Sequence, residues 1–287
     1  MSNAAFILRP MQPGDIEAAM KLSNAEGWNQ LEKDWKLLIE NPENVTLLAQ
    51  TDNKIIGTTT AINYENRVAW IGMVLVDKEY RGQGVSKLLI TNILKKLETC
   101  KSIKLDATSL GEKVYKNFDF KYEYLIARMA NTSIKNLGSS DDEGLTEPIQ
   151  SNHIQEIIAL DEIVFGANRS PLIKSVVNEY PNKAWLLKRN NRITGFVLGR
   201  DGYKYHHIGP VEASNIIDAK ILITRALKNL VDQPVVMDVL SDKEDILHWL
   251  NSIGFKKQRD FIRMYRNENP FPGITDKHYL IFGPEFG

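Results

Sequence analysis

The chain has 287 residues, and 36 Lys and Arg residues balance 36 Asp and Glu residues, so the formal net charge is zero. A chain of this length is expected to form about two domains, and the neutral balance gives no field that favours nucleic acid or an anionic membrane. No apolar run approaches the length of a bilayer span and no signal-like segment opens the chain, which predicts a cytoplasmic protein. The single cysteine, Cys100, excludes an internal disulfide framework and a cysteine-based zinc cluster.

Apolar periodicity and turn signals predict an alternating series of elements in the first 130 residues. A first strand is followed by two helices, three strands, a helix, a strand, a helix and a last strand. We expect Asp15 to cap the first helix. The expected strands are 6–9, 45–49, 54–62, 67–76, 103–107 and 122–129, and the expected helices are 15–22, 31–39, 84–101 and 112–118.

The most distinctive stretch is the end of the strand 67–76 and the turn that leads into the next helix. The turn Arg81-Gly82-Gln83-Gly84 offers free backbone N–H groups at the positive end of a helix dipole, which suits a phosphate. Arg81 adds a guanidinium that pairs with phosphate oxygens. Neither a Walker A loop nor a dinucleotide-binding fingerprint is present. Taken alone, the turn is equally compatible with an ordinary strand-turn-helix corner.

This stretch resembles the pyrophosphate loop of the GNAT N-acetyltransferases, Gln/Arg-x-x-Gly-x-Gly/Ala, with Ser86 in place of the last small residue. Two further segments are similar to the family: the strand Trp70–Val76, and Leu105–Thr108 with the helix motif Val114–Phe120, in which Asp119 replaces the usual Gly. The resemblance implies an α/β fold with a mixed sheet, in which two central strands splay apart beside a helix N-terminus to bind a ligand.

The rest of the chain repeats this scaffold. Lys87–Leu97 aligns with Lys220–Leu230, with seven of eleven positions identical, and Arg128-Met129 recurs as Arg263-Met264. The sequence therefore predicts tandem GNAT-like domains at 1–130 and 148–287, joined by a linker at 131–147. The second copy has no Gly-rich turn between Val211 and Lys220, and Asp218 would face a phosphate there. We expect this copy to be degenerate and not to bind coenzyme A in the usual way.

The resemblance implies acetyl-CoA as co-substrate, with direct acetyl transfer to the primary amine of a small molecule or of a protein or peptide. The strand Val74, Leu75 and Val76 would hold the pantetheine, and an amide of Val74 or Leu75 would stabilise the oxyanion. Tyr115 matches the tyrosine that protonates the departing thiolate. The pyrophosphate would lie on the N–H groups of Arg81, Gly82, Gln83, Gly84, Val85 and Ser86.

A base or water chain must also take the proton of the amine, whose pKa is about 10. Asp106, Glu26 and Asp34 are candidates, and Trp28 and Trp70 are candidate walls of the acceptor pocket, to which the second domain contributes. Asp161, Phe165, Asn168 and Arg169 lie on one stretch of the second domain, which either faces the first domain or is a solvated face, and we expect the solvated face. The adjacent His206 and His207 point to opposite faces of a strand, so we expect no metal site.

Two other hypotheses stay open. The protein is alternatively an acyl-CoA-binding sensor or regulatory protein without turnover, or an interaction scaffold without a cofactor. The identity of the acceptor and the oligomeric state are not encoded in any pattern we recognise.

Overall fold

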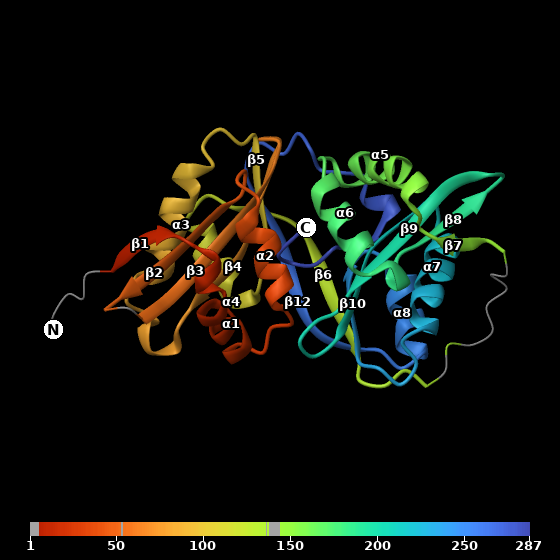
Figure 1. Cartoon of the computed structure of the whole chain (residues 1–287), viewed down its shortest axis with the longest axis horizontal. Coiled ribbons are helices and arrows are strands. Elements are labelled where there is room, and N and C mark those ends of the chain that lie inside the picture. The colour runs from red at the N-terminus through yellow and green to blue at the C-terminus, as the bar shows by residue number, and fades with distance from the viewer. Residues whose placement is uncertain (1–5, 53, 136, 138–143) are drawn as a thin grey trace.

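The computed structural model describes residues 6–52, 54–135, 137 and 144–287. The strands form one thirteen-stranded sheet in the order β1-β2-β3-β4-β5-β12-β6-β11-β13-β10-β9-β8-β7 (Figure 1). The sheet is mixed, because β4–β5 and β10–β11 are parallel pairs among antiparallel neighbours. No helix in the described part of the chain is both long and apolar enough to cross a bilayer.

The first half of the chain, residues 6–135, forms the elements expected from its sequence. Helix α3 ends at Lys96, five residues before the expected end, because the chain closes into a turn in which the Cys100 N–H donates to the carbonyl of Leu97. Asp15 occupies the N-cap position of α1, but its side chain bonds no N–H of that helix; its carboxylate accepts from the Gln12 N–H and from Arg9. The elements are β1 (Ile7–Pro10), α1 (Ile16–Ala25), α2 (Glu32–Glu40), β2 (Val45–Thr51), β3 (Lys54–Tyr64), β4 (Val68–Val76), α3 (Val85–Lys96), β5 (Ser102–Ala107), α4 (Ser109–Lys116) and β6 (Lys121–Asn131).

The second half, residues 144–287, repeats the same order of strands and helices, which confirms the predicted duplication. It adds one strand, β13, after the repeat is complete. Its elements are β7 (Thr146–Pro148), α5 (Ile154–Phe165), α6 (Ser170–Glu179), β8 (Trp185–Arg189), β9 (Arg192–Arg200), β10 (His206–Ala213), α7 (Ile216–Lys228), β11 (Val235–Leu240), α8 (Glu244–Ser252), β12 (Lys256–Asn267) and β13 (His278–Leu280).

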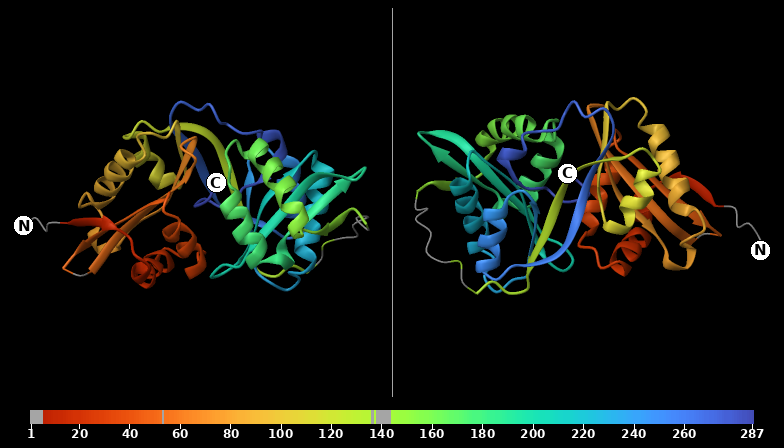
Figure 2. Two further views of the ribbon diagram at one scale, coloured as in Figure 1. Left: turned by 45° about the horizontal axis from the view of Figure 1, so that its top comes forward. Right: turned by 180° about the vertical axis from the view of Figure 1, so that it is seen from behind.

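The last strands of the two halves are exchanged. Strand β12 of the second half lies between β5 and β6, and β6 of the first half pairs with β11. Figure 2 shows these two long strands crossing between the halves. The predicted linker, of which residues 136 and 138–143 lie outside the described residues, thus separates two repeats whose sheets are continuous with each other.

The helices cover the sheet as two layers. Side chains of α1, α2, α5 and α6 share one hydrophobic core on one face, so this core spans both halves. On the other face, α3 and α4 pack over the first half and α7 and α8 over the second, in separate cores. The chain therefore forms a single three-layer body with a shared core at the seam between its halves.

The stretch Asp161–Arg169 lies in this seam, and its expected role as a solvated face is wrong. Asp161 and Arg169 form an ion pair without solvent exposure, and the Phe165 ring packs 5.5 Å from that of Tyr64 and 5.8 Å from that of Trp70. These contacts bury the stretch because Phe165 of α5 packs on the aromatic side chains of Tyr64 in β3 and Trp70 in β4. The prediction of a solvated face fails because Asp161 and Arg169 neutralise each other's charge and are therefore tolerated in the core.

Candidate acyl-CoA site

The strands β4 and β5 pair only over their first residues and then separate. The parallel register runs from Val68 opposite Ser102 to Ile71 opposite Leu105, whereas β4 continues to Val76. A bulge in β4 accompanies the separation: Met73 has φ of 51°, and its carbonyl accepts from Thr58 Oγ1 at 2.9 Å. The segment of β4 after Gly72 therefore has one unpaired edge, as the predicted splay requires.

The orientation of the backbone amides along this edge follows from the hydrogen bond at the end of β4. The Asp77 N–H donates to the Ile56 carbonyl of β3 at 2.8 Å. Because successive residues of a strand turn their amides to opposite sides, the amides of Val76 and Val74 face the open edge, and that of Leu75 faces β3. The Val76 carbonyl accepts from Arg81 Nε at 3.3 Å, which agrees with this alternation.

The turn after β4 has the backbone geometry of an anion site. Gly82 and Gly84 have φ of 75° and 87°, in the left-handed region where a side chain is strained, and both are exposed. The first bond inside α3 runs from the Leu88 N–H to the Gly84 carbonyl at 2.9 Å. The N–H groups of Val85, Ser86 and Lys87 thus have no partner within the helix and stand at its positive end.

Glu26, a predicted base, lies beside this turn rather than deep in the cleft. One of its oxygens is 2.6 Å from Arg81 Nη2 and 3.8 Å from Lys78 Nζ, and its side chain is 26% exposed. A phosphate on the turn would compete with Glu26 for Arg81. The pair therefore links the end of α1 to the predicted phosphate loop.

Tyr115 lies on α4, the helix that follows β5. Its ring packs with its centre 5.8 Å from that of Phe120 at an interplanar angle of 64°, and a Cβ added at Gly111 would lie 3.1 Å from its edge. Burial raises the pKa of the Tyr115 hydroxyl, and no described residue bonds to it. The phenol is therefore neutral near pH 7 and keeps its proton available for donation.

Asp106, the other predicted base, is held in a buried ion pair. Its two oxygens accept from Arg263 Nε and Nη2 of β12, each at 2.9 Å, and its side chain has no solvent exposure. Burial raises the pKa of Asp106 in spite of the opposing charge of Arg263. The contact favours a structural role, and its role as a base stays a prediction.

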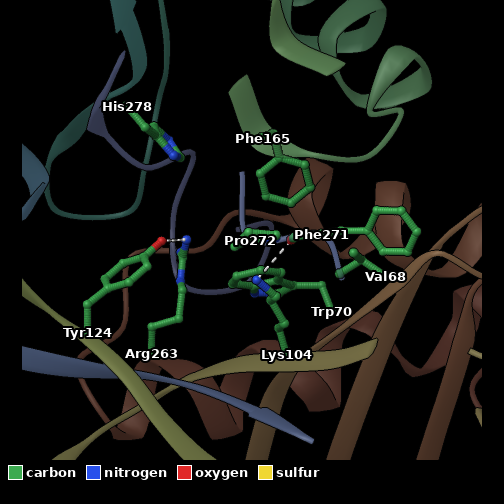
Figure 3. Close-up of a pocket in the computed structure, with 9 residues that line it drawn as sticks. All are labelled: Val68, Trp70, Lys104, Tyr124, Phe165, Arg263, Phe271, Pro272 and His278. Carbon is green, nitrogen blue, oxygen red and sulfur yellow. Dashed lines mark hydrogen bonds between the residues drawn. The ribbon is translucent and has the colours of Figure 1, made fainter. Parts of the chain in front are cut away.

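Trp70 faces the seam between the halves. Its indole N–H donates to the Pro284 carbonyl at 3.0 Å, and the Arg263 guanidinium lies 4.4 Å from its ring centre. Around it is a cavity of about 10 Å³, lined also by Lys104 and Tyr124 (Figure 3), which is room for one water molecule and not for an acceptor. Trp28 is half-buried in the loop between α1 and α2 and packs against the shared core.

The corresponding cleft of the second half is filled by the chain itself. Strands β10 and β11 pair only from His206 to Ile208, and beyond this point β13 inserts between them, with Leu280 opposite both Val211 and Val239. Helix α7 is capped by the Asn215 side chain, and Asp218 binds Arg189 instead of facing an open anion site. The second half thus has neither the open strand edge nor the Gly-rich turn.

Several residues that shape the site escaped the sequence reasoning. Asn29 binds the loop before β10, Arg263 holds Asp106, and Arg200 joins Asp34 to Glu285. The recurrence of Arg128 as Arg263 was a signal in the sequence, because each arginine binds the matching aspartate of the other half. Nothing local marks Asn29 or Arg200, because Asn29 bonds Tyr205 and Arg200 bonds Asp34 and Glu285, all more than 80 residues away in the sequence.

Comparisons with known proteins agree with this architecture. A model described as "Acetyltransferase (GNAT) family" matches residues 15–120, and one described as "Acetyltransferase (GNAT) domain" matches residues 157–280. The holothin acyltransferase of Pseudoalteromonas sp. (strain SANK 73390) is 23% identical over 264 residues, covering 92% of this chain and 88% of that protein. The uncharacterized N-acetyltransferase YitH of Bacillus subtilis (strain 168) is 22% identical over 84% of this chain and 85% of its own length.

Solved structures show the same fold over the whole length. A putative acetyltransferase from Pyrococcus horikoshii superposes with a TM-score of 0.81 at 23% identity, covering 98% of this chain and 96% of that one. A tandem GNAT protein from the clavulanic acid biosynthesis pathway superposes with a TM-score of 0.65 at 8% identity, covering 91% and 98%. The chain therefore belongs to the GNAT family, carries two GNAT domains in tandem, and is an N-acyltransferase.

Proposed function

We propose that the protein transfers an acetyl group from acetyl-CoA directly to a primary amine of a small molecule, protein or peptide, and that it binds one acetyl-CoA per chain. The observation that carries this proposal is the asymmetry between the two clefts. Only the first half combines an open edge of β4 with a Gly-rich turn at a helix N-terminus, whereas β13 fills the second cleft.

The first half offers a donor for each polar part of the thioester substrate. The N–H groups from Gly82 to Lys87 suit the pyrophosphate, and Arg81 adds charge-assisted bonds. The amides of Val74 and Val76, which face the open edge, suit the pantetheine amide and the thioester oxygen. Of the two predicted oxyanion donors, Val74 is favoured over Leu75 by this orientation, because the Leu75 amide faces β3.

Proton transfer assigns different roles to the remaining polar groups. Tyr115 donates its proton to the thiolate sulfur as the C–S bond breaks, because its phenol is protonated near pH 7 and its hydroxyl has no hydrogen-bond partner among the described residues. Both oxygens of Asp106 are occupied by Arg263, so we assign Asp106 to positioning. Glu26, which retains solvent access at the start of the α1–α2 loop, takes the proton of the amine through water.

The second half contributes to the acceptor side by fixing the α1–α2 loop. The Asn29 carbonyl accepts from the Tyr203 N–H, and the Asn29 side chain bonds the backbone of Lys204 and Tyr205 at 2.8 to 2.9 Å. Gly202 is required beside it, because an added Cβ would lie 2.1 Å from Asn29 Nδ2. This loop carries Trp28, which we propose as a wall of the acceptor pocket.

Transfer of labelled acetyl from acetyl-CoA to a panel of primary amines tests the proposal, with propionyl-CoA as a competing donor. Calorimetry should give one acetyl-CoA per chain, and Gly84→Val should abolish binding because a branched side chain cannot adopt φ of 87° without strain. Gly14→Val is the matched control, since an added Cβ at Gly14 meets open space. Tight binding without transfer to any amine would instead favour the sensor, and two bound equivalents would contradict the single site.

A further inference from the structure

The Arg81 guanidinium is folded back from the Gly-rich turn towards the end of α1. Its Nε donates to the Val76 carbonyl at 3.3 Å, and its Nη2 lies 2.6 Å from a carboxylate oxygen of Glu26. These two nitrogens form the side-on edge of a guanidinium, the edge with which Arg263 holds both oxygens of Asp106. Because this edge is already occupied at Arg81, bidentate binding of a phosphate through it requires both contacts to break.

A second cation of the same segment holds the end of α1. Lys78 Nζ donates to the carbonyl of Ala25, the last residue of α1, at 3.3 Å and lies 3.8 Å from Glu26. The side chains of Glu26 and Arg81 are 26% and 49% exposed, so a ligand reaches both from solvent without opening the core. A diphosphate on the turn carries more negative charge than one carboxylate and therefore draws both cations away from Glu26.

The contacts of Glu26 act on the α1–α2 loop, which starts at this residue. Three backbone hydrogen bonds shape the start of the loop. The N–H groups of Glu26 and Trp28 donate to the Ser23 carbonyl at 3.2 and 3.0 Å, and that of Gly27 donates to the Asn24 carbonyl at 3.0 Å. These three amides therefore report whether the end of α1 is held in place.

The α1–α2 loop is thus fixed on both sides of Trp28, the proposed wall of the acceptor pocket. Glu26 is bound to the segment before the Gly-rich turn, Asn29 is bound to the loop before β10, and only Gly27 and Trp28 lie between them. The Glu26 oxygen that faces Arg81 is not available to the water that takes the proton of the amine. Release of Glu26 would free this oxygen and loosen one side of the loop.

We propose that Glu26, Lys78 and Arg81 form a latch, which holds the base in the free protein and opens when the pyrophosphate of acetyl-CoA binds the two cations. Donor binding thereby makes Glu26 available for proton transfer and loosens the loop beside Trp28. This inference rests on the proposed binding of acetyl-CoA at the Gly-rich turn.

A double-mutant cycle measured by calorimetric titration with acetyl-CoA tests the latch. Glu26→Gln removes the competitor for Arg81, so we expect Kd to fall about two- to fivefold, the range for a partly exposed ion pair. In an Arg81→Gln background the same replacement should leave Kd within about 1.5-fold. An equal gain in both backgrounds would show simple repulsion between Glu26 and the phosphates and would overturn the latch.

The matched control is Glu79→Gln, which removes an equal charge from the same segment but pairs with Lys54 instead of Arg81. It should leave Kd within about 1.5-fold, and a gain equal to that of Glu26→Gln overturns the latch. If the wild type binds no acetyl-CoA, the proposed function fails and the latch fails with it. Binding by the wild type without coupling between Glu26 and Arg81 overturns the latch alone.

Hydrogen exchange of the amides of residues 26–28 measures the loop directly. In the free chain, Glu26→Gln should raise exchange about two- to fivefold relative to intrinsic rates, whereas Glu79→Gln should not. Saturating coenzyme A should produce a similar rise in the wild type and no further rise in Glu26→Gln. Protection of these amides by coenzyme A in the wild type, or unchanged exchange in free Glu26→Gln, contradicts the latch.

Discussion

At the scale of single residues, environment decides which titratable groups have the right protonation state for acyl transfer. The neutral phenol of Tyr115 is packed on Phe120, and its hydroxyl has no hydrogen-bond partner in the described part of the chain. Asp106 is the opposite case, because a bidentate arginine occupies both of its oxygens. The resemblance predicted Tyr115 as the acid and the strand position made Asp106 a candidate base, yet of these two only the tyrosine has a functional atom without a hydrogen-bond partner among the described residues.

Replacement of Tyr115 by Phe tests its assignment as the acid. The ring contacts remain, so we expect the thermal shift with acetyl-CoA to persist while kcat falls about 100-fold, within the usual range for loss of a general acid. The matched control is Tyr122→Phe, an exposed tyrosine on β6. A kcat that is unchanged in Tyr115→Phe would remove the tyrosine from the mechanism.

Asp34 makes a prediction about pH and stability. Burial, together with the charge of Glu285, raises its pKa from 3.8 to about 6, although Arg200 opposes the shift. Between these two values the folded chain binds more protons than the unfolded chain, so this group lowers the free energy of unfolding as the pH rises.

Denaturant unfolding of the wild type and of Asp34→Asn from pH 4 to pH 7 measures this contribution. The stability of the wild type relative to the variant should fall by an amount on the order of 2 kcal/mol across this range. A difference that is constant with pH, or that grows as the pH rises, would show that Asp34 is ionised normally in the fold.

At the scale of elements, the loop between α1 and α2 depends on a partner from the other half. Its conformation is fixed by Asn29, which bonds three consecutive residues of the loop before β10. Loops that carry binding residues need such support, since a small displacement of a wall changes affinity for the ligand it contacts.

Asn29→Ala should therefore weaken binding of the acceptor amine and leave binding of the acetyl donor, acetyl-CoA, unchanged. The variant loses the three side-chain hydrogen bonds of Asn29, so we expect KM for the amine to rise about tenfold while KM for acetyl-CoA stays within twofold. Asn24→Ala, on the adjacent helix α1, is the control because it makes no bond to the second half among the described residues. Equal changes in both KM values would mean that Asn29 only stabilises the fold.

At the scale of the whole molecule, the exchanged strands join two repeats into one structure. The ion pair between Asp106 and Arg263 has an exact counterpart in Asp238 and Arg128, whose two bonds are both 2.7 Å. Each pair fastens the last strand of one half to the sheet of the other. The two halves consequently cannot unfold independently, and we expect one cooperative transition.

Asp106→Asn and Asp238→Asn form a matched test of this arrangement. Each leaves a buried arginine without its counter-charge, so each should lower the free energy of unfolding by about 3 to 5 kcal/mol. If Asp106 is structural, the folded fraction of either variant keeps kcat within a few-fold of the wild type. A loss of kcat of several orders of magnitude in Asp106→Asn alone would instead identify Asp106 as the base.

The sequence predicted the order of elements well because each depends on local periodicity and turn chemistry. Strand β4, the Gly82-Gly84 turn and helix α3 lie where the alternation of apolar residues places them. The sequence-based prediction failed for Asp161–Arg169, where two charged side chains pair with each other in the core. From composition alone, such a stretch cannot be distinguished from a solvated surface. The prediction that the Asp15 side chain caps the first helix also differs from the structure, because its carboxylate binds the Arg9 guanidinium instead of a helix N–H.

The sequence by itself determined the duplicated scaffold and the single Gly-rich turn, since both are written in residues close together along the chain. Only the tertiary structure decided where the last strands of the two repeats pair in the sheet. The insertion of β12 beside β5, the closing of the second cleft by β13 and the burial of Asp106 against Arg263 all join residues far apart in the chain. Such pairings depend on which surfaces meet after the sheet has formed, and no local pattern of residues specifies them.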